Sequence, residues 1–317
     1  MEQIDERGLS RPTHPPRWVR RAIPIVGVSW LVLLLGFGSY YLLDQRSQHG
    51  PPKQTLMMQQ ILKAEEAVRA DPSDVVARIS IADLYSEAGS YQEAAEQYQE
   101  ALKLDGKDLP AANGLAFAYV QLKQGEKAVP ILEKAIADNQ DLKVMRTSGD
   151  MAEAHLRLGQ IFLAQGRVDD ARAQAEEALK ISPADADTLL LLGQTRARDG
   201  DLQGAVEQYK KALRMVPKFP EAYEALAAAY EGTGDRPRAA YARAMVTYSR
   251  GDYSAAAGEL EKLVRSSPQV AEAHLGLGMA LERVGKPDEA ASQYRETLRL
   301  DPQLDYAKAR LAALGEN

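Results

Sequence analysis

One spacing recurs along most of this chain and restricts its possible folds more than any other feature. Residue pairs that end in alanine follow one another at steps of 34, 43, 34, 34, 17 and 34; these alanines are Ala94, Ala128, Ala171, Ala205, Ala239, Ala256 and Ala290. Prolines keep the same register, since the step from Pro183 to Pro217 is again 34 and the step from Pro217 to Pro268 is 51, one and a half periods. Such a period indicates stacked units, each packed on its neighbours. The 317 residues therefore predict a repeat array rather than separate globular domains.

Each repeating unit reads as a helix, a turn and a second helix. In residues 152–185, Leu158 and Phe162 lie on one helical stripe, Ala171 and Ala178 lie on another, and Gly166 falls between them. Three columns recur in the other units. A small residue lets two helices approach closely: Ala82, Ala116, Gly159, Gly193, Ala227 and Gly278. A leucine-type neighbour fills the seam: Ile81, Leu115, Leu158, Leu192, Leu226 and Leu277. A glycine supplies the positive φ that ends a helix: Gly89, Gly166, Gly200, Gly234 and Gly285.

A 34-residue helix-turn-helix unit with these columns resembles the tetratricopeptide repeat family. The resemblance covers about residues 55–315 and implies an all-α fold, a right-handed solenoid of helix-turn-helix units. Full units are predicted at 75–108, 109–142, 152–185, 186–219, 237–270 and 271–304, with a half-unit before them that ends at Pro72 and a terminal helix at 305–314 that caps the array. The family's tryptophan column is filled by Arg78, Ala112, His155, Leu189, Tyr223 and His274. No unit carries the tryptophan itself.

Two irregularities interrupt the period. Residues 143–151 insert nine residues between units, which predicts a longer turn or a helix extension, with a binding loop as the alternative. The 17-residue step is half a repeat, so a helix near residues 236–250 must act as second helix to the segment before it and as first helix to the segment after it. Arg243 falls on a core column in either register, so we expect this helix to pack rotated or less tightly. We predict a bend there between a front array, residues 54–235, and a back array, residues 236–317.

The N-terminal region predicts a membrane anchor. Residues 22–43 carry no charge and include twelve Ile, Val, Leu or Phe residues, enough for a transmembrane helix. Residues 1–21 carry five arginines against three acidic residues, so the positive-inside rule places this basic tail in the cytoplasm. Residues 44–53 read as a linker, and the repeats would lie in the periplasm or outside the cell, attached to the cell membrane, the inner one where there are two. A cleaved secretory signal with the apolar run 25–35 is the alternative.

Composition disfavours most catalytic and metal-dependent functions. There is no cysteine, and the four histidines are scattered, so thiolate metal sites, thiol nucleophiles and histidine clusters have no candidates. We expect no cofactor, no metal and no enzymatic activity. The net charge of −6 disfavours nucleic acid as a partner. His155 and His274 share a Glu-Ala-His-Leu-x-Leu-Gly context on a packing column, which favours buried histidines with hydrogen-bond partners over ligands.

The candidate site is the groove lined by first helices. The resemblance implies that particular positions of each first helix face this groove; of these we selected Asn113, Phe117, Leu156, Gln160 and Gln194. The amides could bind a peptide backbone, while Phe117 and Leu156 could form an apolar pocket. The alternative is that these residues, the leucine above all, support packing between repeats. The predicted function is a membrane-anchored scaffold or adaptor for a protein or peptide partner, similar to anchored bacterial repeat proteins of envelope assembly, secretion or cytochrome c maturation. A self-associating structural protein of the membrane surface, a homo-oligomer, is the alternative.

Overall fold

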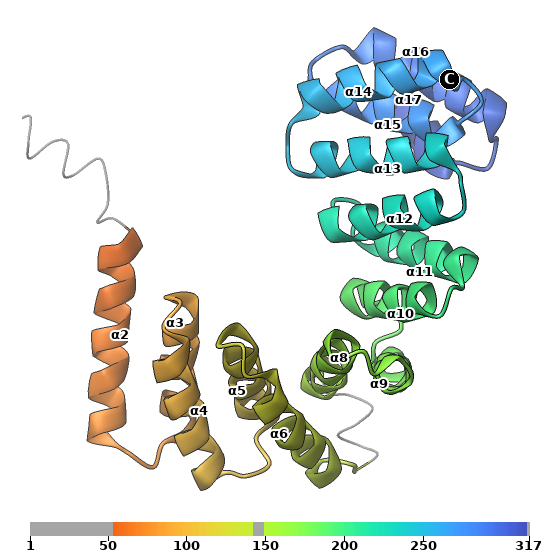
Figure 1. Ribbon diagram of the computed structural model, residues 1–317. Coiled ribbons are helices and arrows are strands. Elements are labelled where there is room, and N and C mark those ends of the chain that lie inside the picture. The colour runs from red at the N-terminus through yellow and green to blue at the C-terminus, as the bar shows by residue number, and fades with distance from the viewer. Residues whose placement is uncertain (1–52, 142–148, 316–317) are drawn as a thin grey trace, which may run out of the picture. The chain divides into compact units, whose positions relative to one another are not determined.

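The computed structural model describes residues 53–141 and 149–315, which form fifteen α-helices and no strand (Figure 1). The helices are α2 (Lys53–Ala70), α3 (Val75–Glu87), α4 (Tyr91–Leu104), α5 (Leu109–Gln121), α6 (Gly125–Asp138), α8 (Gly149–Ala164), α9 (Val168–Ile181), α10 (Ala186–Arg198), α11 (Leu202–Met215), α12 (Pro220–Gly232), α13 (Arg236–Ser249), α14 (Tyr253–Ser266), α15 (Ala271–Arg283), α16 (Pro287–Leu300) and α17 (Asp305–Ala313). Residues 64–317 form one compact unit, to which the packing below refers.

The expected membrane helix, residues 22–43, lies outside the described residues, as does most of the expected linker at 44–53. Lys53, the last residue assigned to that linker, is already the first residue of α2. None of the helices within residues 53–141 and 149–315 has the length and apolar character needed to cross a bilayer.

Successive helices pair as the period predicts. α3 packs on α4, α5 on α6, α8 on α9, α10 on α11 and α15 on α16, and each second helix also packs on the first helix of the next unit. The terminal helix α17 packs on α16 and begins at Asp305, as expected. The all-helical repeat fold is thus confirmed for the described part of the chain.

The boundaries of the helices follow from capping and turn residues. Asp74, Asp108 and Asp185 each accept a hydrogen bond from a backbone N–H three residues on, at 2.7–3.0 Å, and so begin α3, α5 and α10. The five predicted turn glycines all have φ between +76° and +85°. In the unit without such a glycine, Lys123 takes this conformation at φ +61°. Glycine therefore predicts the turn between the two helices in each of these units except the one that contains Lys123.

The two packing columns form the seams between helices. Every member of the small-residue column and of the leucine-type column is buried. Three glycines on first helices lie directly under tyrosine rings from second helices: Gly114 under Tyr98, Gly193 under Tyr209 and Gly278 under Tyr294. A bare Cα is needed there because a Cβ would enter the ring.

Helix α13 packs in both of its expected roles. It packs as a hairpin on α12, and it also packs on α14 and, side by side, on α15. Arg243 falls on a core column of the sequence in either register, and the expected rotation of α13 keeps it out of the core. Arg243 is exposed and pairs with Glu231 of α12, because α13 is turned so that Ala242, Met245 and Val246 are the buried residues. The bend predicted at this helix stays a prediction.

The last three residues of the insertion between the second and third units extend helix α8 at its N-terminus. Of residues 143–151, Gly149–Met151 form the first turn of α8, while residues 142–148 lie outside the described part of the chain. Met151 is fully buried in the core between α5, α6 and α8. The insertion therefore contributes a core residue as well as length.

Candidate functional site

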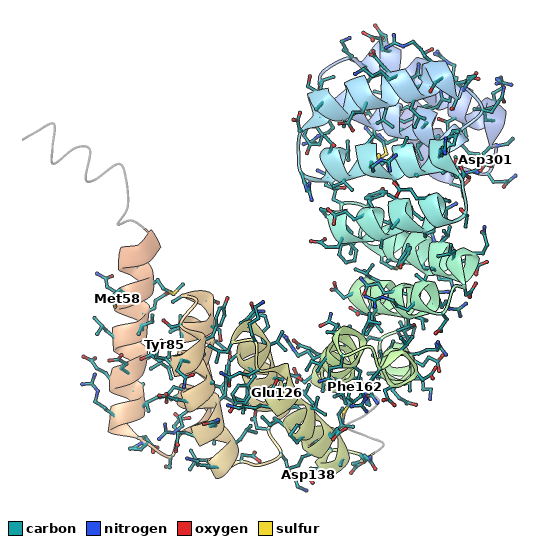
Figure 2. All side chains as sticks on the ribbon, viewed as in Figure 1. Met58, Tyr85, Glu126, Asp138, Phe162 and Asp301 are labelled. Carbon is teal, nitrogen blue, oxygen red and sulfur yellow. The ribbon has the colours of Figure 1, made fainter. Side chains whose placement is uncertain are left out.

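First helices α5, α8 and α10 place three of the five selected residues along two adjacent hollows. The first hollow has a volume of about 380 Å³ and is lined by Phe117 of α5, by Arg157 and Gln160 of α8, and by Glu126 of α6, which Figure 2 labels. The second, of about 360 Å³, is lined by Gln160 and Leu163 of α8, Gln194 of α10 and Tyr209 of α11. Gln160 belongs to both hollows. Together they form the surface that we call the front groove.

Phe117 is held in place by contacts on both sides. Its ring meets the Tyr91 ring edge to face, with centroids 6.0 Å apart. The Arg157 guanidinium lies over the Phe117 ring at 5.1 Å, and Arg157 is also paired with Glu153 one helical turn away. Phe117 remains partly exposed. The front groove thus contains a positioned aromatic ring with a partly neutralised cation next to it.

The two glutamines offer amide groups one repeat apart. Gln160 is exposed and Gln194 is half-buried, and neither side chain makes a hydrogen bond to another described residue. A primary amide both donates and accepts, as a peptide backbone requires. Burial raises the pKa of Tyr209, which lines the same hollow, to about 12, so this phenol keeps its proton near neutral pH. The groove therefore presents uncharged donors and acceptors beside the charged groups of Glu126, Arg157 and Arg198, which also line it.

The structure does not bring Asn113 into this groove. Asn113 is 3% exposed, and its Nδ2 donates to the backbone oxygen of Asp150, 2.8 Å away in the first turn of α8. Its Oδ1 is buried without a hydrogen-bond partner among the described residues. Asn113 fastens α5 to the helix extension that the insertion creates, so its position follows from a contact with a residue of the next unit.

Leu156 lies apart from the other selected residues. It lines a third hollow, with Gly149 and Asp185, and packs against a small cluster that contains Leu191 and Leu192. This placement agrees with the alternative interpretation for the leucine, which was support of packing between repeats.

Both histidines of the packing column are buried and hydrogen-bonded. His155 Nδ1 lies 2.7 Å from Gln174 Oε1, and His274 Nδ1 lies 2.8 Å from Gln293 Oε1. His274 Nε2 also lies 3.1 Å from the backbone oxygen of Pro268. Each partner glutamine belongs to the second helix of the same unit, at the same sequence separation from its histidine. The structural role expected for these histidines is confirmed.

Sequence reasoning missed the tyrosine column and Arg157. The steps from Tyr98 to Tyr209 and from Tyr209 to Tyr294 are 111 and 85, and they contain the same nine-residue insertion and half step as the alanine column. That spacing could have identified the tyrosines. Arg157 gave no comparable signal, because only the packing of α5 on α8 places its guanidinium over Phe117.

Comparison with known proteins gives the family of the repeats. Family models described as tetratricopeptide repeat match residues 62–108, 86–147, 150–218, 190–247 and 241–305. The BBSome complex member BBS4 of Bos taurus is 31% identical over 148 residues, which are 46% of this chain and 26% of that protein. The TPR repeat-containing protein YpiA of Bacillus subtilis (strain 168) is 22% identical over 238 residues, 75% of this chain and 50% of that protein.

Among solved structures, BtubC from P. vanneervenii superposes with a TM-score of 0.52 at 19% identity, over 63% of this chain and 90% of that chain. This likeness concerns the fold alone. The chain spans less than half the length of the first curated relatives that it matches, at 26%, 11% and 49% of their lengths.

Proposed function

Because the chain belongs to the tetratricopeptide repeat family, we propose that it is a scaffold that binds a segment of a partner protein in the front groove. One observation carries this proposal: two amides without partners among the described residues, Gln160 and Gln194, lie in adjacent hollows next to the Phe117 ring. Amides can pair with a peptide backbone, and the ring can cover an apolar side chain. Such contacts suit an extended protein segment.

We also propose that residues 22–43 hold the array at the cell membrane, with residues 1–21 in the cytoplasm and the repeats in the periplasm or outside the cell. The support is the uncharged run at 22–43 behind five arginines. Protease added to intact cells, or to spheroplasts if there is an outer membrane, should then remove a C-terminal tag and spare an N-terminal one. Loss of the N-terminal tag alone would contradict this orientation.

An anchored, exported scaffold fits work at a membrane surface, such as envelope assembly, secretion or cytochrome c maturation. In each of these, proteins must be brought together beside the bilayer. We propose that this chain recruits a partner protein to the membrane surface. The identity of that partner will decide among envelope assembly, secretion and cytochrome c maturation.

The test is affinity capture with full-length protein from its native membrane, after chemical cross-linking. The double variant Gln160→Ala/Gln194→Ala removes the groove amides and breaks no hydrogen bond between described residues. Its matched control is Gln59→Ala/Gln203→Ala, two exposed glutamines on α2 and α11 whose side chains make no hydrogen bond to another described residue. We expect partner capture to fall at least several-fold in the groove variant and to persist in the control, with equal helicity in both.

Equal capture by the groove variant and the wild type would contradict the proposed groove. Capture of only further copies of the same chain would replace the scaffold with the self-associating structural protein. Asn113 is left unchanged in this design, because its substitution would also remove the bond to Asp150 and confuse binding with stability.

A further inference from the structure

The half-repeat step changes which helices form the first-helix layer. Before the step, first helices pack side by side in the order α3, α5, α8, α10 and α12. After it, the corresponding contact joins α13 to α15. Helix α13, which follows α12 in Figure 1, is at the same time the hairpin partner of α12. Helix α13 therefore serves as second helix to α12 and also begins the row of first helices that α15 continues.

A separate cavity of about 440 Å³ opens where this change occurs. It is lined by residues of α11, α12, α13 and α15 and by the segment that leads into α17. It shares no residue with the front groove. Its size lies within the range of about 300–1,000 Å³ that is usual for ligand sites.

The lining of this cavity is mainly apolar and aromatic. Tyr223 and Tyr241 meet edge to face with ring centroids 6.4 Å apart, and Leu275 and Met279 of α15 lie partly exposed along it. Tyr306 of α17, 49% exposed, completes the lining. We call this site the step pocket. A large side chain could enter it without displacing the core.

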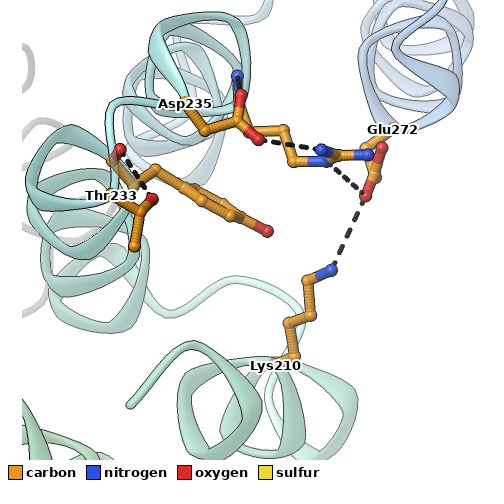
Figure 3. A network of polar contacts seen from close by, with 6 residues as sticks. Lys210, Thr233, Asp235 and Glu272 are labelled. Carbon is orange, nitrogen blue, oxygen red and sulfur yellow. Dashed lines mark hydrogen bonds and ion pairs between the residues drawn. The ribbon is translucent and has the colours of Figure 1, made fainter. Parts of the chain in front are cut away.

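Three of the four charged side chains that line the step pocket, Lys210, Glu272 and Asp301, already have a polar partner. Glu272 of α15 accepts from Arg238 of α13 at 3.3 Å and pairs with Lys210 of α11 at 3.6 Å (Figure 3). Arg238 also donates to Asp235 at 2.8 Å. Asp301, labelled in Figure 2, accepts the backbone N–H of Gln303 at 3.0 Å within the turn before α17. The two contacts of Glu272 connect α15 with α13 and α11 around the pocket.

Arg214 is the exception. It is exposed, it lines the pocket, and it makes neither a hydrogen bond nor an ion pair with any other described residue. It belongs to a stretch, residues 208–218, that contains four lysines and arginines and no acidic residue in a chain of net charge −6. A free guanidinium beside an apolar cavity fits a carboxylate attached to a large apolar group.

We propose that the step pocket is a second docking site, which binds an acidic segment of a partner protein by enclosing one large apolar side chain and pairing a neighbouring carboxylate with Arg214. The occupant follows from the polar partners: Glu272 and Asp301 already accept hydrogen bonds, whereas Arg214 has no partner among the described residues, so an added carboxylate would gain one. This site differs from the front groove in both lining and charge, and the proposal does not depend on the groove.

The experiment uses the full-length protein in detergent and a displayed library of random 12-residue peptides. We expect selected peptides to include a class with an aromatic or leucine residue beside Asp or Glu. Affinity of this class should fall about tenfold or more in Arg214→Glu, since a charge-assisted contact is replaced by repulsion. Tyr306→Ala, at an exposed position, should weaken the same peptides several-fold.

Two controls separate this site from other effects. Lys211→Glu makes the same change of charge on a nearby residue of α11, which is exposed and does not line the pocket, and should leave affinity nearly unchanged. Gln160→Ala/Gln194→Ala should also leave this class unchanged, so failure of the front groove and failure of the step pocket give different results. Circular dichroism checks that each variant folds.

Three results would overturn the proposal. The first is that no selected peptide class depends on Arg214 or Tyr306. The second is that the dependent class lacks an acidic residue or a large apolar one. The third is self-association of the protein that Arg214→Glu abolishes, which would assign the pocket to a second copy of the chain instead of a partner.

Discussion

Single glycines decide how closely paired helices approach. Gly278 of α15 faces Tyr294 of α16, a fully buried tyrosine, and a Cβ at this glycine would lie 2.6 Å from the ring. The Tyr294 hydroxyl donates to Glu282 at 2.5 Å, which fixes the ring from its other end. The Tyr294 ring therefore occupies the space that a side chain at position 278 would need.

Gly278→Ala should therefore destabilise the protein by about 1–3 kcal/mol, because the added methyl group forces a buried ring to shift. The control is Gly258→Ala in α14, where a Cβ would meet nothing within 4 Å. That change should stabilise by up to about 1 kcal/mol, since alanine favours helix over glycine. Denaturation followed by circular dichroism measures both, and a Gly278→Ala protein as stable as the wild type would contradict the packing account.

Glu282 makes the attachment of α17 depend on pH. Hydrogen bonding to the Arg310 guanidinium of α17, and to Tyr294, holds the pKa of this carboxyl below its ordinary value of 4.5. A carboxyl whose pKa is lower in the folded state stabilises that state at higher pH, and the contribution is lost as pH falls through the lowered value.

We expect Glu282→Gln to lower the unfolding temperature at pH 7, and the difference from the wild type to shrink as pH falls below 4.5. The control Glu261→Gln removes an exposed pair with Arg265 and should change little at any pH. Thermal unfolding at a series of pH values gives the comparison. A difference that stays constant throughout the acidic range would show that the carboxylate charge is not what matters.

At the scale of elements, α13 joins the two registers of the array. Its N-cap residue, Asp235, accepts the Arg238 backbone N–H at 3.1 Å and also binds the Arg238 guanidinium. Through Glu272 and Lys210 this cap connects α13 with α15 and α11 (Figure 3). The sequence predicts the double role of this helix from the 17-residue step. The place of Arg243 on a core column also predicts a rotated or less tightly packed helix. It does not predict which residues the rotation buries, because that depends on which of two competing registers packs more closely.

Asp235→Ala should cost about 1–2 kcal/mol of stability, the usual loss for an N-cap, and more than Asp252→Ala. Asp252 caps α14 through the Ala255 N–H at 3.0 Å, and its side chain makes no bond to another helix in the described part of the chain. Urea denaturation of the two variants makes the comparison under the same conditions. Equal losses would mean that the polar network around Glu272 adds nothing at the half step.

At the scale of the whole molecule, periodic columns predict the helices, their turns and their buried seams in the described residues. They also place Phe117, Gln160 and Gln194 on one surface, because first helices of successive units present equivalent positions. The same reasoning fails for Asn113, since the insertion brings Asp150 next to it and removes it from that surface. The step pocket could not be predicted either, because it is lined by residues from different registers.

Photo-cross-linking from single positions can show whether a partner protein lies in the front groove. A photoreactive phenylalanine would replace Gln160 in the full-length protein in its native membrane, with Gln203 of α11 as the exposed control. We predict a cross-linked product with a protein partner from position 160 and none from position 203. Equal products from both positions, or a partner captured only from position 203, would contradict the account.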